Sequence, residues 1–360
     1  MVGRLPDADF WEGRRVLLTG HTGFKGAWLA LWLKRLGAVV SAVALPPPAG
    51  PSLAKAAAVD EACSGIMLDI RDAAALARAV RGSRPSVVFH LAAQALVRQS
   101  LADPLQTFET NVNGTLNLLE GLRNTEGIDA AVFITSDKVY LNDGRGQPYR
   151  EDDALGGKDP YSASKAACEI AVKSYAECFF PAGRPAIATA RAGNVIGGGD
   201  FAIDRIVPDC VRAAAGNRPI LLRHPRAVRP WQHVLDCLCG YLLFAETLVS
   251  APAGLPRALN FGPGGKHAVT VEALATAMRD ALGSSSRITH AAQSDDRESS
   301  LLLLNSDLAR RSLGWQDRLP ADLAIAWTAA WYRQWSKGKD MRAPTLAQIE
   351  AYGALREHAE

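Results

Sequence analysis

Paired cysteines and histidine clusters are absent from this sequence of 360 residues. Its six cysteines form no C-x-x-C pair, and neither Cys237 nor Cys239 has a second pair or a histidine cluster close by in the sequence. This spacing does not match the usual zinc-site patterns, and we predict no metal. Buried free thiols in a reducing compartment are the better interpretation of the cysteines.

The sequence also lacks a long uninterrupted apolar segment and a strong charge of one sign. The most apolar long stretch, Val234 to Val249, contains Asp236 and Glu246, which favours a buried helix over a membrane span. The N-terminal residues MVGRLPDADFWEG contain no apolar signal core, so we expect a cytoplasmic protein that binds no membrane. The net charge is only +3 and the arginines are scattered, which argues against binding to nucleic acid.

Apolar segments of strand length alternate with helical segments through the first half of the chain. These segments are continuous apolar runs, which is typical of parallel strands buried on both faces. The predicted strands cover residues 15–20, 38–45, 65–69, 86–92, 130–136 and 186–197. Residues 1–190 are therefore predicted to form a doubly wound parallel α/β sheet of the Rossmann type.

The pattern becomes irregular after residue 190, where segments rich in Pro and Gly separate shorter elements. Helices are predicted at residues 204–215, 234–248, 271–282 and 321–335. We predict a smaller, mixed α/β lobe over residues 191–340 that binds substrate, and the chain is free to cross between the two lobes. The charged tail, residues 341–360, is expected to be loosely held.

The segment TGHTGFKG places Gly20, Gly23 and Gly26 directly after the first strand and at the start of the first long helix. Gly20 permits a tight turn, Gly23 lets a pyrophosphate approach the backbone, and Gly26 lets the helix pack close to the strand. The start of the helix then offers free N–H groups and a partial positive charge to the phosphates. This loop predicts a dinucleotide site.

Tyr161 and Lys165 are four residues apart at the start of a predicted helix, so they share one face. An ammonium group beside a phenol lowers the phenol's pKa from about 10. Tyr161 can then remove a hydroxyl proton while hydride leaves the same carbon. Ser136, at the end of a neighbouring strand, is placed to hydrogen-bond the reacting oxygen.

Asp137 and Lys138 follow Ser136 directly. Neighbours on a regular strand point to opposite faces, so both reach one substrate only if the strand has already ended, as the end of the apolar run at Thr135 permits. A protonated ammonium cannot accept a proton, so Lys138 is either a neutral base or a charged group that stabilises a developing negative charge. We favour the base. Asp137, as a proton donor, needs a raised pKa.

The glycine spacing, the Tyr-Lys pair and the motifs HLAAQ, NVNGT and LDIRD resemble the extended branch of the short-chain dehydrogenase/reductase superfamily. The resemblance implies NAD as the cofactor. The second strand, in SAVALPPP, has neither the acidic residue that holds the ribose of NAD nor an arginine for NADP, so the residues alone leave this choice open. The cofactor-binding residues that the resemblance implies are Gly20, Thr22, Gly23, Phe24, Lys25, Gly26, Asp69, Ile70, Leu91, Ala92, Ala93, Asn111, Tyr161 and Lys165.

A narrower resemblance concerns Ser136-Asp137-Lys138, where the dTDP-glucose dehydratases carry Thr-Asp-Glu. With AAQALVRQS, DPYSASKAACE, ARAGNVIGGGD and RPWQHV, the sequence is similar to the CDP-D-glucose 4,6-dehydratases over roughly residues 10–335. This implies oxidation of CDP-glucose at C4, loss of water across C5 and C6, and return of the hydride to C6, for deoxysugar biosynthesis. Asp137 would protonate the leaving C6 oxygen, and Lys138 would act at C5.

The resemblance also implies how the substrate is held and how chains assemble. The predicted substrate-binding residues are Gln94, Asn194, Arg205 and Arg229, with Arg191 near the sugar; arginine suits a diphosphate because it binds bidentately. Family members pair through two helices each, here near residues 103–123 and 161–178, so a homodimer or a higher homo-oligomer is expected. The alternatives are a dehydratase or 4-epimerase for another nucleotide sugar and, more remotely, a non-catalytic NAD(P)-sensing regulator.

Overall fold

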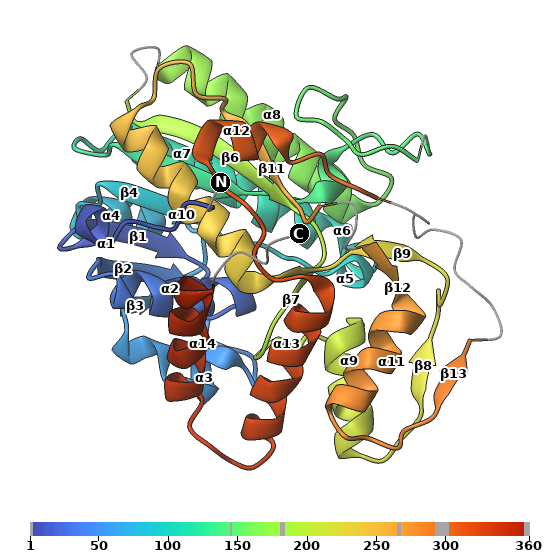
Figure 1. The fold of residues 1–360 in the computed structure, drawn as a ribbon. Helices are drawn as coiled ribbons and strands as arrows, with labels where there is room; N and C mark the ends of the chain where they lie inside the picture. The colour runs from blue at the N-terminus through green and yellow to red at the C-terminus, as the bar shows by residue number, and fades with distance from the viewer. Residues whose placement is uncertain (1–2, 145, 181–183, 265–267, 292–301, 356–360) are drawn as a thin grey trace.

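The computed structural model describes residues 3–144, 146–180, 184–264, 268–291 and 302–355. Its largest feature is a seven-stranded sheet in which all neighbouring strands are parallel. From edge to edge the strands are β11 (Ala258–Phe261), β6 (Ala186–Ala192), β5 (Ala130–Ile134), β4 (Val87–His90), β1 (Arg15–Thr19), β2 (Val39–Ala44) and β3 (Ser64–Met67). This is the predicted Rossmann-type sheet (Figure 1), and its strand order reverses between β1 and β4.

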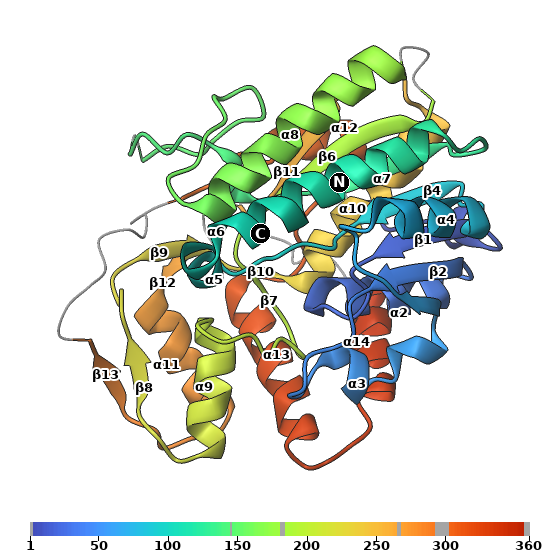
Figure 2. The ribbon, with the colours of Figure 1, turned by 180° about the vertical axis from the view of Figure 1, so that it is seen from behind.

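Helices bury both faces of this sheet, as Figures 1 and 2 show from opposite sides. They are α2 (Phe24–Arg35) and α10 (Val234–Ser250) on one face, and α4 (Ala73–Ser83), α7 (Gly114–Arg123) and α8 (Pro160–Phe179) on the other. Along β1, Val16 and Leu18 pack into the first core and Leu17 into the second. A fully buried side chain of this size stabilises the fold by about 1.5–3 kcal/mol, which explains the continuous apolar runs.

Strand β3 departs from this pattern because it forms an edge of the sheet. All four of its residues are exposed, including Ile66 and Met67. The apolar run at residues 65–69 therefore predicts the strand correctly but not its burial, since no described strand lies beyond it.

Short helical segments complete the first half of the chain. They are α1 (Ala8–Trp11), α3 (Leu53–Ala56), η1 (Val59–Glu61), α5 (Val97–Ala102), α6 (Pro104–Phe108), η2 (Glu109–Asn113) and η3 (Asp137–Val139). The π-helical turn η2 joins α6 to α7, so residues 104–123 form one nearly continuous helical stretch, close to the predicted 103–123.

The second half of the chain builds small sheets beside the large one (Figure 1). The paired strands are β7 (Val195–Ile196) with β10 (Gln232–His233), β8 (Ile220–Leu222) with β13 (Ile288–His290), and β9 (Val228–Pro230) with β12 (Ala268–Thr270). The helices are α9 (Ile206–Ala215), α11 (Val271–Ala281), α12 (Asp307–Leu313) and α13 (Ala321–Trp335). Between these elements the chain returns to the large sheet through α10 and β11, so it crosses between the two regions as the sequence allowed.

The expectation of a loosely held tail is wrong for most of its length, because residues 342–354 form the helix α14. Tyr352 is fully buried, its ring lies 5.6 Å from that of Trp32, and its hydroxyl donates to Asp236 Oδ1 at 2.8 Å. Thr345, Ile349 and Tyr352 form a buried stripe at helical spacing. The last five residues, 356–360, lie outside the described part of the chain.

Candidate active site

The glycine loop between β1 and α2 is shaped for the close approach of a phosphate group. Gly20 has a φ of +83°, and a Cβ there would lie 2.7 Å from Ala92 N. A Cβ on Gly26 would collide with Gly20 O, so both positions require glycine. Gly23 begins α2 without a side-chain cap, which leaves the N–H groups of the first turn for an anion. The pyrophosphate of a dinucleotide fits this cradle.

The segment after β4 is held against the glycine loop by Thr19, the last residue of β1. Thr19 Oγ1 accepts hydrogen bonds from Leu91 N and Ala92 N, each at 3.1 Å, and lies 2.7 Å from His90 Nδ1. Burial lowers the pKa of His90 to about 3, so its imidazole is neutral and Nδ1 accepts the hydroxyl proton. Leu91, Ala92 and Ala93 therefore follow β4 at the carboxyl edge of the sheet, where such folds bind cofactors.

Asp69 and Ile70, two of the predicted cofactor-binding residues, follow β3, while Thr22 lies in the glycine loop. Asp69 Oδ2 is 2.6 Å from Arg71 Nη2, and this hydrogen-bonded pair lowers the pKa of Asp69. Thr22 Oγ1 donates to Leu45 O at 2.9 Å, which ties the glycine loop to the end of β2. Ile70 is buried. The contacts of these residues with a cofactor stay predictions.

Asn111 and Gln94 turn their side chains into the protein. Asn111 Oδ1 accepts from Gln94 N at 2.8 Å, and Asn111 Nδ2 donates to Gln94 O at 3.0 Å and to Ser164 Oγ at 2.9 Å. Gln94 Nε2 donates to Thr107 Oγ1 at 2.9 Å. Asn111 thus joins the segment after β4 to helix α8, and the predicted cofactor role of Asn111 and substrate role of Gln94 stay predictions.

The segment after β5 turns away from the strand direction at once, as the sequence predicts. Ser136 Oγ accepts from Lys138 N at 3.2 Å and donates to Asp137 Oδ1 at 2.9 Å. Asp137 is only 5% exposed. Burial raises the pKa of Asp137, although the charge of Lys138 and the hydrogen bond from Ser136 oppose this. The carboxyl group therefore meets the requirement for a proton donor.

Tyr161 and Lys165 lie on the first two turns of α8, but their predicted interaction is not found. Lys165 Nζ donates instead to Ile134 O, the last residue of β5, at 3.0 Å. Desolvation raises the pKa of Tyr161 to about 12, against the effect of a hydrogen bond with Ser136. The expected lowering of this pKa by Lys165 is thus wrong for this arrangement, because the ammonium group is directed at a backbone carbonyl.

Two arginines from the second half of the chain act on these catalytic candidates. The charge of Arg205 lowers the pKa of Tyr161, and that of Arg229 lowers the pKa of Asp137, each against the larger effect of desolvation. Arg205 Nη1 is held by Asp200 Oδ2 at 2.9 Å, and Arg229 lies on β9. The structure therefore brings Arg205 near Tyr161 and Arg229 near Asp137.

Arg191 is not at the sugar site, contrary to expectation. Its side chain is 4% exposed, and Nη2 lies 2.7 Å from Glu169 Oε2 in the interior. Asn194 follows β6 by two residues and is half-buried, at the edge of the sheet predicted for a substrate-binding residue.

One further side chain at this site, Tyr241 on α10, carries no signal in the sequence. This phenol is fully buried, and its hydroxyl lies 3.5 Å from Lys25 Nζ. Both Tyr161 and Asp137 contribute to the raised pKa of Tyr241 after the larger effect of burial, so the three groups are neighbours. The surrounding helix is apolar on all sides and carries no motif, so only the packing of α10 against α2 reveals the residue.

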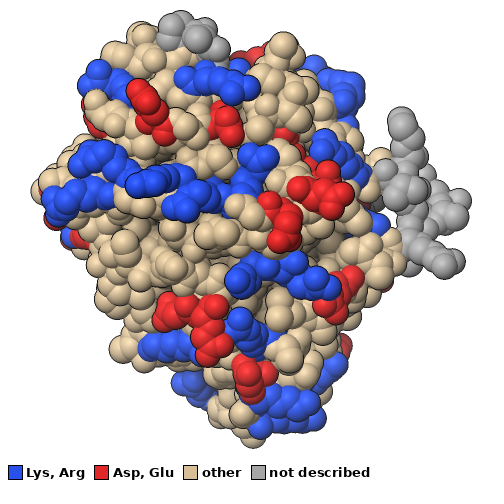
Figure 3. All heavy atoms as spheres, turned by 90° about the vertical axis from the view of Figure 1, so that its left-hand side faces the viewer, with Lys and Arg blue, Asp and Glu red and all other residues tan. Residues whose placement is uncertain are grey.

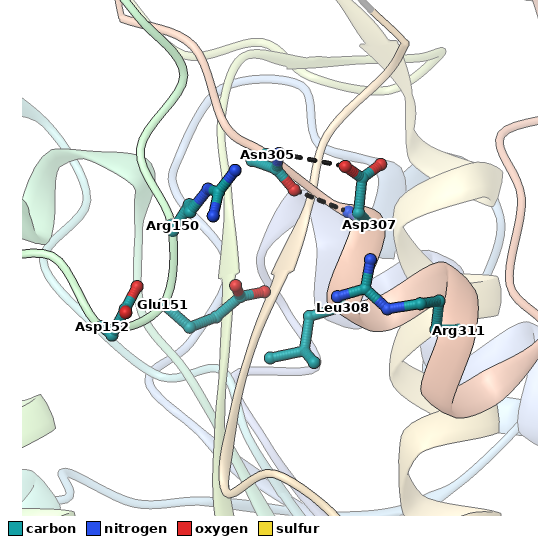
Figure 4. Close-up of a pocket in the computed structure, with 7 residues that line it drawn as sticks. All are labelled: Arg150, Glu151, Asp152, Asn305, Asp307, Leu308 and Arg311. Carbon is teal, nitrogen blue, oxygen red and sulfur yellow. Dashed lines mark hydrogen bonds between the residues drawn. The ribbon is translucent and has the colours of Figure 1, made fainter.

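A separate cavity of about 350 Å³ contains none of the predicted site residues (Figure 4). Arg150 and Arg311 extend toward it from opposite sides. Its lining consists of Arg150, Glu151, Asp152, Asn305, Asp307, Leu308 and Arg311.

The described residues contain neither a membrane-spanning helix nor a cluster of metal ligands. None of the described helices has the length and apolar character needed to cross a membrane. No group of three or more His, Cys, Asp or Glu side chains in the described segments is arranged to hold a metal ion. On the face shown in Figure 3, basic side chains form short rows beside acidic ones.

One family model matches the part of the chain that contains this site. It is described as the NAD dependent epimerase/dehydratase family and matches residues 16–262, from β1 to the residue after β11. The chain belongs to the NAD dependent epimerase/dehydratase family. The matched region contains the glycine loop, the Ser136–Lys138 turn and the Tyr161–Lys165 pair.

Individual members of the family resemble this chain to different degrees. The CDP-glucose 4,6-dehydratase of Salmonella typhimurium is 39% identical over 351 residues, which is 96% of this chain and 98% of that protein. The UDP-glucose 4-epimerase of Rhizobium meliloti is 30% identical and covers 73% of this chain and 81% of its own length. The crystal structure of dTDP-glucose 4,6-dehydratase from Bacillus anthracis in complex with NAD superposes with a TM-score of 0.76 over 92% of this chain and all of that one. At 18% identity this last likeness shows the fold.

Proposed function

We propose that this family member is an NAD-dependent CDP-glucose 4,6-dehydratase, a hydro-lyase that forms CDP-4-keto-6-deoxy-D-glucose. The observation that carries the proposal is the Ser136-Asp137-Lys138 turn beside Tyr161, in a chain similar over 96% of its length to a CDP-glucose 4,6-dehydratase. A 4-epimerase needs only oxidation and reduction at one carbon. The extra acid and amine at residues 137 and 138 match the additional proton transfers of a dehydration.

The redox chemistry, removal of a hydride from C4 of the sugar and its return to C6, would be supplied by bound NAD. The glycine cradle would hold its pyrophosphate, and Leu91, Ala92 and Ala93 would lie along its nicotinamide half. Lys165, whose ammonium group donates to Ile134 O in this structure, would hold the ribose of the nicotinamide half.

Tyr161 would remove the proton of the C4 hydroxyl in the first step. Its raised pKa makes the phenolate costly, so the step depends on positive charge near the phenol. Arg205 supplies part of that charge, and the oxidised nicotinamide ring would supply the rest. Ser136, already hydrogen-bonded with Tyr161, would hold the same oxygen while the C4 carbonyl forms.

Asp137 and Lys138 would then carry out the elimination. A carbonyl at C4 makes the C5 hydrogen acidic, Lys138 takes that proton, and Asp137 donates its own proton to the C6 oxygen, which leaves as water. The alternative for Lys138 is to remain charged and to stabilise the enolate. Return of hydride to C6 and of a proton to C5 completes the product.

The two halves of the chain would bind different ligands. Residues 1–190 would hold NAD, and residues 191–340 would hold the nucleotide sugar, with the chain crossing between them. Arg205 and Arg229 would bind the diphosphate, and Gln94 and Asn194 the sugar nucleotide. CDP follows from the similarity to the Salmonella protein.

We also propose that two chains form a cytoplasmic homodimer through residues 103–123 and 161–178. Exposed apolar side chains on and next to these helical stretches support this. They are Leu105 (68% exposed), Phe108 (38%), Ile170 (61%) and Phe179 (46%). Burial against a second copy would remove this apolar surface from water.

The decisive experiment is incubation of the purified protein and NAD with CDP-, dTDP-, UDP- and GDP-glucose, followed by mass spectrometry of the products. We expect loss of one water from CDP-glucose alone. Conversion of UDP-glucose without a change of mass would identify an epimerase. Binding of NAD without turnover of any sugar would identify a regulator.

A further inference from the structure

A buried ion pair lies behind the catalytic residues, and none of the steps proposed above uses it. Glu169 on α8 and Arg191 on β6 are 3% and 4% exposed, and Glu169 Oε2 lies 2.7 Å from Arg191 Nη2. Removing two charges from water is unfavourable unless hydrogen bonds satisfy both groups. The hydrogen-bond partners of Glu169 and of the two Arg191 Nη atoms show what the pair holds together, while Arg191 Nε is buried without a partner among the described residues.

Glu169 binds the residue just before the catalytic turn. Glu169 Oε1 accepts from Thr135 Oγ1 at 2.5 Å, and Oε2 accepts from Thr189 Oγ1 at 2.7 Å. Since Thr135 precedes Ser136, this carboxylate anchors the entry to the turn.

Arg191 binds Tyr140, the second residue after the same turn. Its Nη1 donates to Tyr140 OH at 2.8 Å, and Tyr140 OH donates to Asn260 Oδ1 on β11 at 2.7 Å. Arg191 Nη1 also donates to Glu151 O at 3.0 Å, and Glu151 Oε1 accepts from Asn260 N, so the outer end of the network reaches the cavity of Figure 4. The exit of the turn is thereby anchored to the same ion pair as its entry.

Glu169 also lies on the helix that carries the other catalytic residues. It follows Tyr161 by eight positions and Lys165 by four, so all three lie along one side of α8. We propose that the Glu169–Arg191 pair is a positioning device that fixes the Ser136–Lys138 turn relative to Tyr161 and Lys165. The importance of this relative position rests on the proposed function. Tyr161 on α8 would act at C4 and the turn residues at C5 and C6, so both elements must reach the same sugar ring.

The need for such a device follows from the distances at which protons are transferred. Donor and acceptor must approach to about 2.6–3.2 Å, and a displacement of about 1 Å lowers a rate by about 10²-fold. Lys165 with Ile134 O and Ser136 with Tyr161 already link this segment to α8, but neither contact holds both ends of the turn. The ion pair connects them through charged hydrogen bonds, which are shorter and stronger than neutral ones.

The test compares Glu169→Gln with Glu246→Gln. Glu246 is a matched control because it too is buried (1% exposed), lies 2.8 Å from an arginine, Arg4, and accepts from Trp11 Nε1 at 2.7 Å. Backbone hydrogen–deuterium exchange needs no substrate. In Glu169→Gln we expect exchange at residues 135–140 to rise by about 10- to 100-fold, the range for loss of a hydrogen bond to a charged group. In Glu246→Gln exchange there stays unchanged.

Turnover provides the second readout. With CDP-glucose, Glu169→Gln should lower kcat by about 10²-fold while KM changes less than about threefold, because the binding residues are untouched. Glu246→Gln should keep the kcat of the unmodified chain. Exchange at 135–140 that is unchanged, or that rises equally over the whole chain, would overturn the positioning role. Lack of turnover in the unmodified chain would refute the proposed function. The hydrogen–deuterium exchange result would then still decide whether the ion pair positions the turn.

A gentler pair of variants applies if Glu169→Gln does not fold. Thr135→Val and Thr189→Val each remove one hydrogen bond to Glu169 and keep the ion pair. Only Thr135 adjoins the catalytic turn, so we expect faster exchange at residues 136–138 and a lower kcat in Thr135→Val alone. Equal effects of the two substitutions would overturn the proposal.

Discussion

Asp137 offers the sharpest test of the chemistry, because burial raises its pKa as the proposed role of a proton donor requires. The carboxyl group is 5% exposed, accepts from Ser136 Oγ at 2.9 Å, and has its pKa raised by burial. Asp137→Asn keeps the size and still accepts that hydrogen bond, but the amide cannot supply a proton. Removing a general acid lowers a rate by about 10²–10⁴-fold, or about 2.7–5.5 kcal/mol of activation free energy.

The assay separates the two halves of the reaction. In a single turnover with CDP-glucose, Asp137→Asn should still reduce NAD, which is followed by absorbance, while the release of 4-keto-6-deoxy product slows by the factor above. Asp280→Asn, at an exposed carboxylate on α11, is the control and should leave both rates unchanged. Dehydration by Asp137→Asn at the rate of the unmodified chain would refute the assignment of the acid.

The pH dependence gives an independent check with a defined sign. Because the pKa of Asp137 is raised in the folded chain, the native state keeps this proton at pH values above the unfolded value of about 3.9. Its contribution to stability is therefore greatest below that value and falls as pH rises through the folded pKa. Elimination should decline on the alkaline side of the same pKa, and Asp137→Asn should remove that decline. An unchanged pH profile in the variant would assign the decline to another group.

Three further predictions concern the amine, the cofactor loop and the C-terminal helix. Lys138→Met should allow reduction of NAD but block exchange of the C5 hydrogen with solvent; normal exchange, measured by mass spectrometry in deuterated water, would remove Lys138 from the base role. Gly26→Ala should weaken NAD binding by more than about tenfold in calorimetry, because the new Cβ meets Gly20 O and displaces the loop; unchanged affinity would contradict the cradle. Tyr352→Phe should lower the free energy of unfolding by about 1–3 kcal/mol, because Asp236 loses a buried hydrogen bond; an unaltered denaturation midpoint would show that α14 is held by packing alone.

Most of the large sheet could be predicted because its signals are local. A strand buried on both faces is apolar throughout, as at residues 130–134, and an amphipathic helix repeats every three to four residues, as at 73–83. The glycine loop is equally local, since backbone geometry at Gly20 and Gly26 admits no side chain. Helix α14 is not evident from the sequence because its buried stripe is short.

The sequence by itself determined the Rossmann-type sheet, the dinucleotide loop and the set of catalytic residue types, because each depends on neighbours within a few positions. Only the tertiary structure decided which charges meet. It turned Lys165 toward Ile134 O, placed Tyr241 beside Lys25, and buried Arg191 against Glu169. These contacts join residues 31, 216 and 22 positions apart, and no local periodicity encodes such distances. Burial and charge at a site depend on everything that packs around it, so its proton chemistry emerges only when the chain is folded.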